Sequence, residues 1–336
     1  MLGKFRFDKY LKILSEINKN EGVKIKFAIQ TNGILVDSEW IKIFEKYSIS
    51  VGISIDGPKH INDRNRIDFN GRGTYEKTML GFYLLKKAYE EKLIPHFGIL
   101  SVSSPDLAGS ELYDHFVNEL CVSNFDILFP IDSHDSFDIK SIEGYKKYYN
   151  KLFKLWVAGD VKAVNIRLFD RIALQIVSGA SYVSGSSKAR NGGHLIITVS
   201  SSGAIGPDDS LKTIRGNHFK EISVFNSNYS DLIESNFFNV ILEAENTIPQ
   251  SCQDCSWKQL CRGGATGGRL INRYSSVSGF NNSSVMCEVL DDLYSEMSAY
   301  LLENGISFED LQNSLFTECI NWLEYDQEKV RREVAL

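Results

Sequence analysis

The stretch VKIKFAIQTNGILVDSEWIKIFEKYSISVGISIDGP, residues 23–58, decides the fold of this chain. It opens with VKIKFAI at residues 23–29, whose alternation and β-branched content predict a strand. Asp37 and Ser38 then offer an N-cap to the periodic segment WIKIFEKY, which predicts a helix. A second short apolar run, SVGISI at residues 50–55, predicts another strand. Strand, helix and strand in this order indicate two parallel strands joined by a helix.

The same alternation continues on both sides of this stretch. An amphipathic segment at residues 9–19 predicts a helix before it, and residues 75–91 predict a long helix after it. Strands are expected at residues 96–102 and 125–129, with a helix at 111–120 between them. The first half of the chain is therefore predicted to be an α/β fold built on a parallel sheet.

Polar residues and turn formers follow three of the expected strands. They are QTNG at residues 30–33, SIDGP at 54–58 and PID at 130–132. Parallel sheets carry their chemistry where strands end and loops begin, so these groups are candidates to present hydroxyl, amide or carboxylate groups to a ligand. Ordinary turn chemistry is the competing interpretation, and each group fits it as well.

Composition limits the classes of function. The chain has 336 residues, of which 43% are hydrophobic and 24% charged, which is typical of a globular protein long enough for two domains. A formal net charge of -6 argues against nucleic acid as a partner. The sequence shows neither the apolar core of a signal peptide nor a run long enough to span a bilayer. We therefore expect a cytoplasmic protein with no membrane partner.

The pattern changes after about residue 160. Residues 178–193 are rich in serine and glycine, which is typical of a connection between domains or a long surface loop. A hairpin-like element follows at residues 195–203, and a helix is expected at 285–303. These changes predict three parts: residues 1–160, residues 161–304, and a helical tail at 305–336 to which we assign no function.

Four of the six cysteines are clustered near the end of the second part: Cys252, Cys255, Cys261 and Cys287. A reducing compartment keeps thiols free, so thiols this close together are metal ligands more often than disulfide partners. The spacing fits both a [4Fe–4S] cluster and Zn²⁺, since both accept four thiolates. Cys121 and Cys319 are interpreted as buried thiols.

Two blocks of the sequence resemble a known family, the radical SAM enzymes with a SPASM domain, which include anaerobic sulfatase-maturating enzymes and maturases of ribosomal peptides. Residues 30–66 resemble the middle of the barrel, and residues 252–287 resemble the C-terminal cluster-binding segment. The segments DSLK at 209–212 and GFNNSSV at 279–285 are most similar to the subgroup that forms cyclophane crosslinks in peptides. The resemblance runs from the first residues to about residue 304.

The resemblance implies a fold and a chemistry. It implies a partial radical SAM (β/α)6 barrel without its first strands at residues 1–160, and a SPASM-type, cluster-binding α+β domain at 161–304. In such enzymes a reduced cluster cleaves S-adenosylmethionine, and the deoxyadenosyl radical abstracts hydrogen from a side chain of a bound precursor peptide. The implied cofactor-binding residues here are Ser54, Asp56 and Arg66, with Gln30, Thr31 and Asn32 as weaker candidates. For Asp56, an Asx turn before Gly57 is an alternative role.

The chain also departs from the family. The motif Cys-x3-Cys-x2-Cys, which holds the catalytic cluster, is absent from this sequence, as is the glycine-glycine-glutamate-proline strand end. Cysteines that many SPASM proteins have near Asn191, Asp208 and Ala265 are absent as well. The cysteine quartet can therefore build one auxiliary [4Fe–4S] cluster, with zinc as the alternative metal.

Two interpretations of function remain open. In the first, the chain belongs to a radical SAM/SPASM system that modifies or crosslinks side chains in ribosomal-peptide or sulfatase maturation. The missing barrel strands then come from a complementary N-terminal fragment, or they precede a misplaced start. In the second, it is a non-catalytic homologue that binds a peptide or a partner enzyme and keeps a structural metal site. The catalytic residues are not identified by the sequence in either case.

Overall fold

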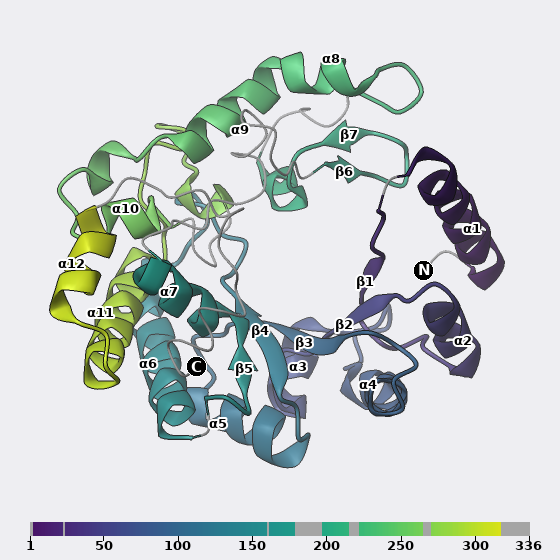
Figure 1. The fold of residues 1–336 in the computed structure, drawn as a ribbon, viewed down its shortest axis with the longest axis horizontal. Helices are drawn as coiled ribbons and strands as arrows, with labels where there is room; N and C mark the ends of the chain where they lie inside the picture. The colour runs from purple at the N-terminus through teal and green to yellow at the C-terminus, as the bar shows by residue number, and fades with distance from the viewer. Residues whose placement is uncertain are drawn as a thin grey trace. The chain divides into compact units, whose positions relative to one another are not determined.

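The structure, a computed structural model, describes residues 3–22, 24–159, 161–178, 197–214, 222–264 and 270–316. Packing divides the chain into two compact units (Figure 1). The first contains residues 1–103, 110–127 and 163–166, and the second contains residues 104–109, 128–162 and 167–336. The three-part domain division drawn from the sequence stays a prediction.

The first unit is built on a five-stranded sheet. Its strands follow the order β1-β2-β3-β4-β5, and the pairs β1–β2, β2–β3 and β4–β5 are parallel. The strands are β1 (Ala28–Thr31), β2 (Ser50–Ser54), β3 (Phe97–Val102), β4 (Asn124–Leu128) and β5 (Asn165–Ile166). This confirms the predicted α/β class, and an open parallel sheet with helices between its strands is the layout of a partial (β/α) barrel.

Helices connect these strands and cover the outer face of the sheet (Figure 1). Phe44 of one helix and Phe82 and Leu85 of another are fully buried, as are Val51 and Ile53 of β2. The predicted cap is confirmed, because the Asp37 carboxylate accepts hydrogen bonds from the backbone of Glu39 and Trp40. The helices are α1 (Lys4–Glu21), α2 (Ser38–Lys46), α3 (Lys59–Asn65), α4 (Tyr75–Glu90) and α5 (Gly109–Tyr113).

The first unit differs from the prediction at one cysteine and in two elements. Cys121, interpreted as a buried thiol, is exposed, since it follows the end of the helical segment. The strand expected at residues 23–29 is β1 at Ala28–Thr31, because Ala28 is the first residue that meets a partner, Ser50, where β2 begins. The helix expected at 111–120 is the short α5 followed by a wider π-helical segment, Asp114–Glu119. Alternation and periodicity report which face is apolar, but they do not report the length of the partner strand or a change in helical pitch.

The second unit is mainly helical. Helix α11 packs on α6 and α7, and α12 packs on α7. The large side chains Tyr148, Tyr149, Phe153 and Trp156 of α6 are buried there. The predicted hairpin is confirmed in its described part as the antiparallel pair β6 (Thr198–Val199) and β7 (Ile205–Gly206). The helices are α6 (Ile142–Ala158), α7 (Arg167–Ser178), α8 (Tyr229–Glu234), α9 (Asn236–Asn246), α10 (Lys258–Cys261), α11 (Cys287–Glu303) and α12 (Phe308–Phe316).

Several predictions fall on residues that the structure does not describe. They concern the serine- and glycine-rich stretch from residue 179 on, Cys319, and the tail from residue 317 on. Within the described residues, no helix is both long and apolar enough to cross a membrane.

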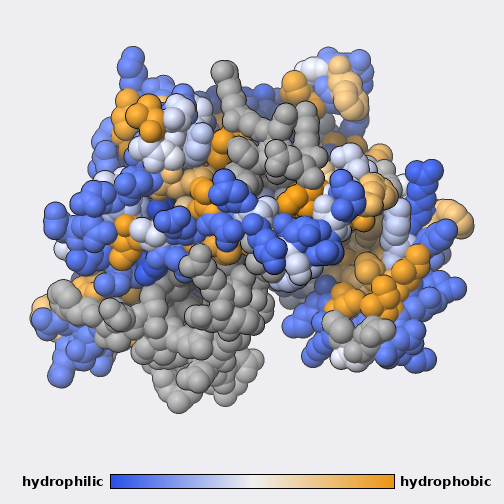
Figure 2. Space-filling view, turned by 90° about the horizontal axis from the view of Figure 1, so that it is seen from above, coloured by the Kyte–Doolittle hydropathy of each residue, from blue (hydrophilic) through white to orange (hydrophobic). Residues whose placement is uncertain are grey.

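Helix α1 carries an apolar stripe that the first unit leaves open. Tyr10, Ile13, Leu14 and Ile17 follow helical spacing and are 54%, 43%, 40% and 44% exposed. Figure 2 shows a band of apolar residues on the right, the side on which α1 lies in Figure 1. In the sheet, β1 pairs on one side with β2 and is an edge strand. An exposed apolar stripe beside an unpaired edge is a surface that another chain can cover.

Candidate functional site

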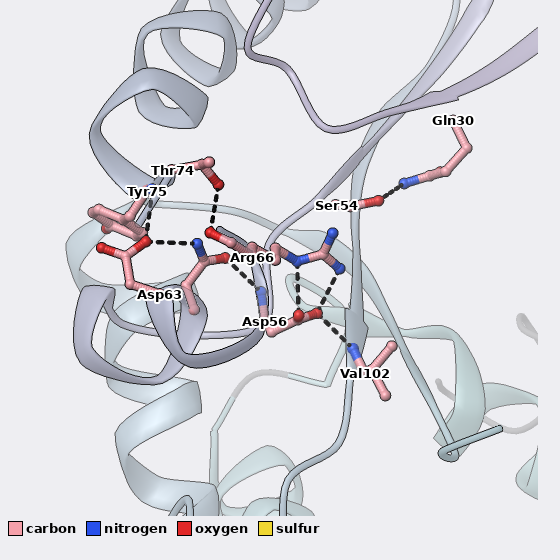
Figure 3. Close-up of polar contacts among 9 residues, drawn as sticks. Gln30, Ser54, Asp56, Asp63, Arg66, Thr74, Tyr75 and Val102 are labelled. Carbon is pink, nitrogen blue, oxygen red and sulfur yellow. Dashed lines mark hydrogen bonds and ion pairs between the residues drawn. The ribbon is translucent and has the colours of Figure 1, made fainter. Parts of the chain in front are cut away.

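The ends of β1 and β2 bring two predicted residues together. The Gln30 side-chain amide donates a hydrogen bond of 2.8 Å to the Ser54 hydroxyl (Figure 3). Gly52, which pairs with Gln30 across the two strands, leaves the space for this contact: a Cβ at position 52 would lie 2.0 Å from Gln30 Oε1. The glycine therefore lets a long polar side chain lie across the neighbouring strand.

Asp56 and Arg66, two further candidates for cofactor binding, pair with each other. Arg66 Nε and Nη2 donate hydrogen bonds of 2.6 and 2.7 Å to the two carboxylate oxygens of Asp56 (Figure 3). Asp56 also accepts a bond of 3.0 Å from the backbone of Val102 at the end of β3. The carboxylate is thus held by the segment after α3 and by the neighbouring strand. Among the described residues, Arg66 and Val102 are the partners of the Asp56 carboxylate, and the Asx turn considered as its alternative role is not among these bonds.

The backbone around this pair is fixed as well. The side-chain oxygen of Asn62, a fully buried residue, accepts a bond of 3.2 Å from the Asp56 backbone, and the Thr74 hydroxyl donates one of 2.8 Å to the Arg66 carbonyl. Figure 3 shows the remaining guanidinium nitrogen of Arg66 directed away from the Asp56 carboxylate. Two of the three Arg66 nitrogens are therefore used to position the third.

Asn32 and Thr31 have local roles. The Asn32 side chain accepts a bond of 3.3 Å from the backbone of Ile34, and the Thr31 hydroxyl accepts one of 3.2 Å from Gly33. Gly33 has a φ of 78°, a left-handed conformation that glycine adopts without strain. These contacts are the turn chemistry that the sequence left open. Binding of a cofactor by Gln30, Asn32, Ser54, Asp56 and Arg66 stays a prediction.

The second site is the cysteine quartet. Cys252, Cys255, Cys261 and Cys287 line one small pocket, together with Ser284 and other residues. Cys252 ends a 3-10 turn, Cys255 follows it with a backbone bond of 3.2 Å to the Cys252 carbonyl, and Cys261 ends α10. Cys287 is the first residue of the long helix α11. The structure therefore brings all four predicted ligands to one pocket: two from consecutive turns, one from the end of α10 and one from the start of α11.

Two glycines close this pocket after Cys261. Gly263 and Gly264 have φ values of 77° and 104°, which disfavour any residue with a side chain. A Cβ at position 264 would lie 2.5 Å from Ser284 Cβ, and one at 263 would lie 2.7 Å from Pro249 Cγ. The Ser284 backbone donates a bond of 3.0 Å to the Gly263 carbonyl. Close backbone packing thus joins the turn that carries Cys261 to the segment that leads into Cys287.

The surroundings of the quartet favour neutral thiols until a positive charge is bound. Burial, followed by the like charge of neighbouring cysteines, raises the pKa of Cys261 and raises that of Cys287 to about 11. Burial also raises the pKa of Cys252. A metal centre would supply the missing positive charge, and the start of α11 favours a thiolate at Cys287.

The donor set fits a thiolate-bound metal centre. Four cysteines that line one small pocket are a donor set that both a [4Fe–4S] cluster and Zn²⁺ accept. Among the described residues, no three His, Cys, Asp or Glu side chains are grouped closely enough to hold a single metal ion.

Two residues that support this region were not predicted. Arg273 is buried and donates to the carbonyls of Ala244, Thr247 and Phe280, and Asn272 is fully buried. Burial lowers the pKa of Arg273, although the neighbouring Cys252 favours its charged form. The sequence gives little sign of this role, because Asn272 and Arg273 are two adjacent polar residues, and nothing in their sequence neighbours indicates that they are buried.

We compared the chain with protein families, curated proteins and solved structures. A scan against protein-family models finds no match. The chain is 26% identical over 292 residues to a cysteine-type anaerobic sulfatase-maturating enzyme of Clostridium novyi, covering 84% of this chain and 74% of the relative. It is 29% identical over 276 residues to the enzyme of the same name from Clostridium perfringens, covering 79% and 70%.

A solved structure has the same fold. It is described as native anSMEcpe with bound AdoMet and Kp18Cys peptide, and it matches with a TM-score of 0.73 at 23% identity over 90% of this chain and 82% of that one. The solved protein is a radical SAM/SPASM enzyme. This chain is therefore a homologue of the anaerobic sulfatase-maturating enzymes, and its fold is that of the radical SAM/SPASM enzymes.

Proposed function

We propose that this chain functions in radical SAM-dependent maturation, in which a side chain of a ribosomal precursor peptide or of a sulfatase is modified or crosslinked. The observation that carries this proposal is the convergence of Cys252, Cys255, Cys261 and Cys287 on one pocket in a chain homologous to sulfatase-maturating enzymes. The fold of an enzyme solved with AdoMet and a peptide supports it.

We assign S-adenosylmethionine to the ends of β1 and β2. Ser54 and Gln30 offer a hydroxyl and an amide there, and the third nitrogen of Arg66 is suited to a carboxylate of the cofactor. Asp56 has a positioning role, because its oxygens already bind Arg66 and Val102. Asn32 is the weakest candidate, since its side-chain oxygen closes a turn.

The quartet is proposed to hold an auxiliary [4Fe–4S] cluster, which supplies redox chemistry or anchors substrate when bound. The four cysteines would each provide one thiolate, and the glycines at 263 and 264 form part of the pocket wall, packed closely on Pro249 and Ser284. Chemical analysis of anaerobically purified protein should find about four iron and four sulfide per chain. Zinc without iron would contradict the redox assignment and favour a structural site.

Catalysis requires three more thiolates than this sequence provides in the form Cys-x3-Cys-x2-Cys. We propose that an N-terminal part carrying this motif supplies them and covers the β1 edge and the open stripe of α1. The test mixes the purified chain with the N-terminal part of the Clostridium perfringens relative that precedes the matched region, and measures deoxyadenosine formed from S-adenosylmethionine under reducing, anaerobic conditions. Deoxyadenosine is expected in the mixture, and its formation by residues 1–336 alone would refute the requirement for this N-terminal part.

A non-catalytic role is the second candidate. The mutual pairing of Asp56 and Arg66 favours it, since the pair is complete without a ligand. In that case the chain would bind a peptide or a partner enzyme and keep a structural metal. S-adenosylmethionine is expected to bind only when the barrel is completed, so calorimetric titration in the presence of the N-terminal part separates the two. Binding that is weakened by Ser54→Ala supports the first function, whereas no binding with retained metal supports the second.

A further inference from the structure

The second unit contains a pocket of about 700 Å³ that none of the roles above uses. One wall is the loop that follows β4, with Asp132 and Asp135; of these, Asp132 belongs to the polar strand end at residues 130–132 that the sequence singled out. The other walls come from residues 213–214 and 271–276. Its apolar surface is formed by isoleucines, among them the buried Ile271, and by Tyr274. The pocket therefore combines carboxylates with an apolar surface.

Buried hydrogen bonds hold the pocket in shape. The side chain of Asn272, which is 0% exposed, donates bonds of 2.8 Å to the carbonyls of Pro130 and Asp132. His134 donates two more, from its backbone to the Tyr274 carbonyl and from Nε2 to the Ser283 carbonyl, both at 2.8 Å. These four bonds fix the loop to its opposite wall, so that a ligand would meet a formed site and not have to order it.

The Asp135 carboxylate is oriented by the opposite wall as well. Its two oxygens accept bonds of 2.9 and 3.1 Å from the backbone and hydroxyl of Ser276. Asp132 accepts one bond of 3.0 Å from the Ser136 hydroxyl. A carboxylate has about four acceptor sites, so both groups can accept further bonds.

The charge of the two carboxylates is not balanced within the pocket. Lys, Arg and His are absent from its described lining, and among the residues that the structure describes neither Asp132 nor Asp135 takes part in an ion pair. Burial raises the pKa of the nearby Tyr145 to about 12, and the negative charge of Asp132 adds to the effect. The pocket thus has a negative potential that a cation would relieve.

We propose that this pocket binds a guanidinium or ammonium group on an apolar stem, such as an arginine or lysine side chain of a peptide. The carboxylates of Asp132 and Asp135 would accept from the cationic head, and Ile131, which is 43% exposed, and Tyr274 would contact the methylene groups. A single metal ion would leave most of the volume and the apolar wall unused. The proposal rests on the proposed function in one respect, namely that the ligand is part of a peptide.

The test uses the full chain and two blocked peptides, acetyl-Ala-Ala-Arg-Ala-Ala-amide and the same peptide with norleucine in place of arginine. Norleucine keeps an unbranched apolar stem and removes the charge. Isothermal titration calorimetry at low salt should give about tenfold tighter binding of the arginine peptide. In Asp132→Asn, which keeps the loop bond from Ser136, this preference should be lost. Asp138→Asn is the matched control, since Asp138 is exposed on the same loop outside the pocket and should leave the preference unchanged.

Three results would overturn the proposal: equal affinity for the two peptides, no binding of the arginine peptide, or a preference that survives in Asp132→Asn. If Asp132→Asn does not fold, the unchanged chain still tests the proposal. Its preference for the arginine peptide over the norleucine peptide should fall as salt is raised, and a peptide with glutamate at that position should bind more weakly than the norleucine peptide. Tight Mg²⁺ binding that Asp132→Asn removes would also contradict it. Failure of the proposed function is seen separately, as absence of deoxyadenosine formation, because peptide binding needs no S-adenosylmethionine.

Discussion

The pairing of Asp56 with Arg66 shows what one residue pair contributes to the first unit. Both side chains are largely covered, with 12% and 25% exposed, and two parallel hydrogen bonds join them. Lysine can supply the charge of Arg66 but not the two parallel N–H donors of its planar guanidinium group. We expect Arg66→Lys to lower the free energy of unfolding by about 1–2 kcal/mol in urea denaturation.

Arg72 offers the control for this change. It pairs with Asp68 at 2.9 Å, but the Arg72 side chain is 69% exposed, so Arg72→Lys should have little effect. Equal unfolding midpoints for the two variants would show that the Asp56–Arg66 pair does not stabilise the fold.

The glycine turn beside Cys261 predicts a selective effect on metal binding. Gly264→Ala combines an unfavourable positive φ with a Cβ placed 2.5 Å from Ser284 Cβ. It should cost roughly 3 kcal/mol of unfolding free energy and lower the iron bound per chain. Gly279→Ala is the matched control, since its φ is also positive but no atom lies within 4 Å of the added Cβ. Gly279→Ala should lose about 1 kcal/mol of unfolding free energy and keep its iron. Equal iron content in Gly264→Ala and Gly279→Ala would show that the close contact between position 264 and Ser284 does not affect metal binding.

Tyr145 predicts how stability changes in alkali. Burial raises its pKa from 10.0 to about 12, so between these values the unfolded chain ionises while the folded chain keeps the proton. The stabilisation from Tyr145 is therefore complete below pH 10 and is lost as the pH rises towards 12. Melting temperatures measured across this range should fall less steeply for Tyr145→Phe than for the unchanged chain. Tyr229→Phe, at an exposed tyrosine, should leave the slope as it is.

At this scale the sequence predicted residues that act through their own chemistry and missed those that act through distant partners. Asp37 was predicted as a cap because its target is local, and the four cysteines because their spacing is characteristic. Arg273 and Asn272 bond to backbone carbonyls of segments far along the chain. Such bonds leave no periodic pattern, so the sequence alone could not reveal them.

Among the elements, the strands were predicted best. Apolar runs gave β2, β3 and β4 to within about one residue at their starts, because each lies inside the sheet with buried residues along it. The edge strand β1 was placed too early, since its length is set by its partner and not by its own alternation. The π-helical segment at Asp114–Glu119 was missed because its side chains still follow an approximately helical pattern.

The helix α1 supports a prediction about association. Its open stripe includes Ile13 and Ile17, which are 43% and 44% exposed. Changing both to lysine should reduce self-association of the isolated chain, because it removes an apolar surface next to an unpaired strand. Sedimentation velocity would measure this, and a pull-down would measure capture of the N-terminal fragment, which should fall. Lys9→Ala and Lys12→Ala on the same helix serve as a control that should not weaken capture. Unchanged capture by the double lysine variant would show that the stripe is not the contact surface.

At the scale of the whole molecule, the sequence identified the fold class and the family resemblance, and the comparisons confirm both. The two units were not foreseen as the structure has them. The second unit takes in residues 104–109 and 128–162 from the first half of the chain, where the alternation of helix and strand is the same as in the first unit. The unit to which a segment belongs depends on its packing against segments that are distant in the sequence. Local sequence patterns do not contain that information.

The packing of α6 against α11 has a consequence for synthesis. Lys146 on α6 lies 3.5 Å from Glu288 on α11, and Asn150 bonds to Asp292 at 3.3 Å, so a helix made early closes on one made near the end. At the usual rates of translation, α11 is synthesised on the order of ten seconds after α6, so the aromatic side chains of α6 lack this partner during that time. Cys287 opens that same late helix, so the thiol pocket is complete only when α11 has left the ribosome. A metal centre that uses all four thiols, as proposed above, could therefore be bound only after α11 has been made and has packed on α6.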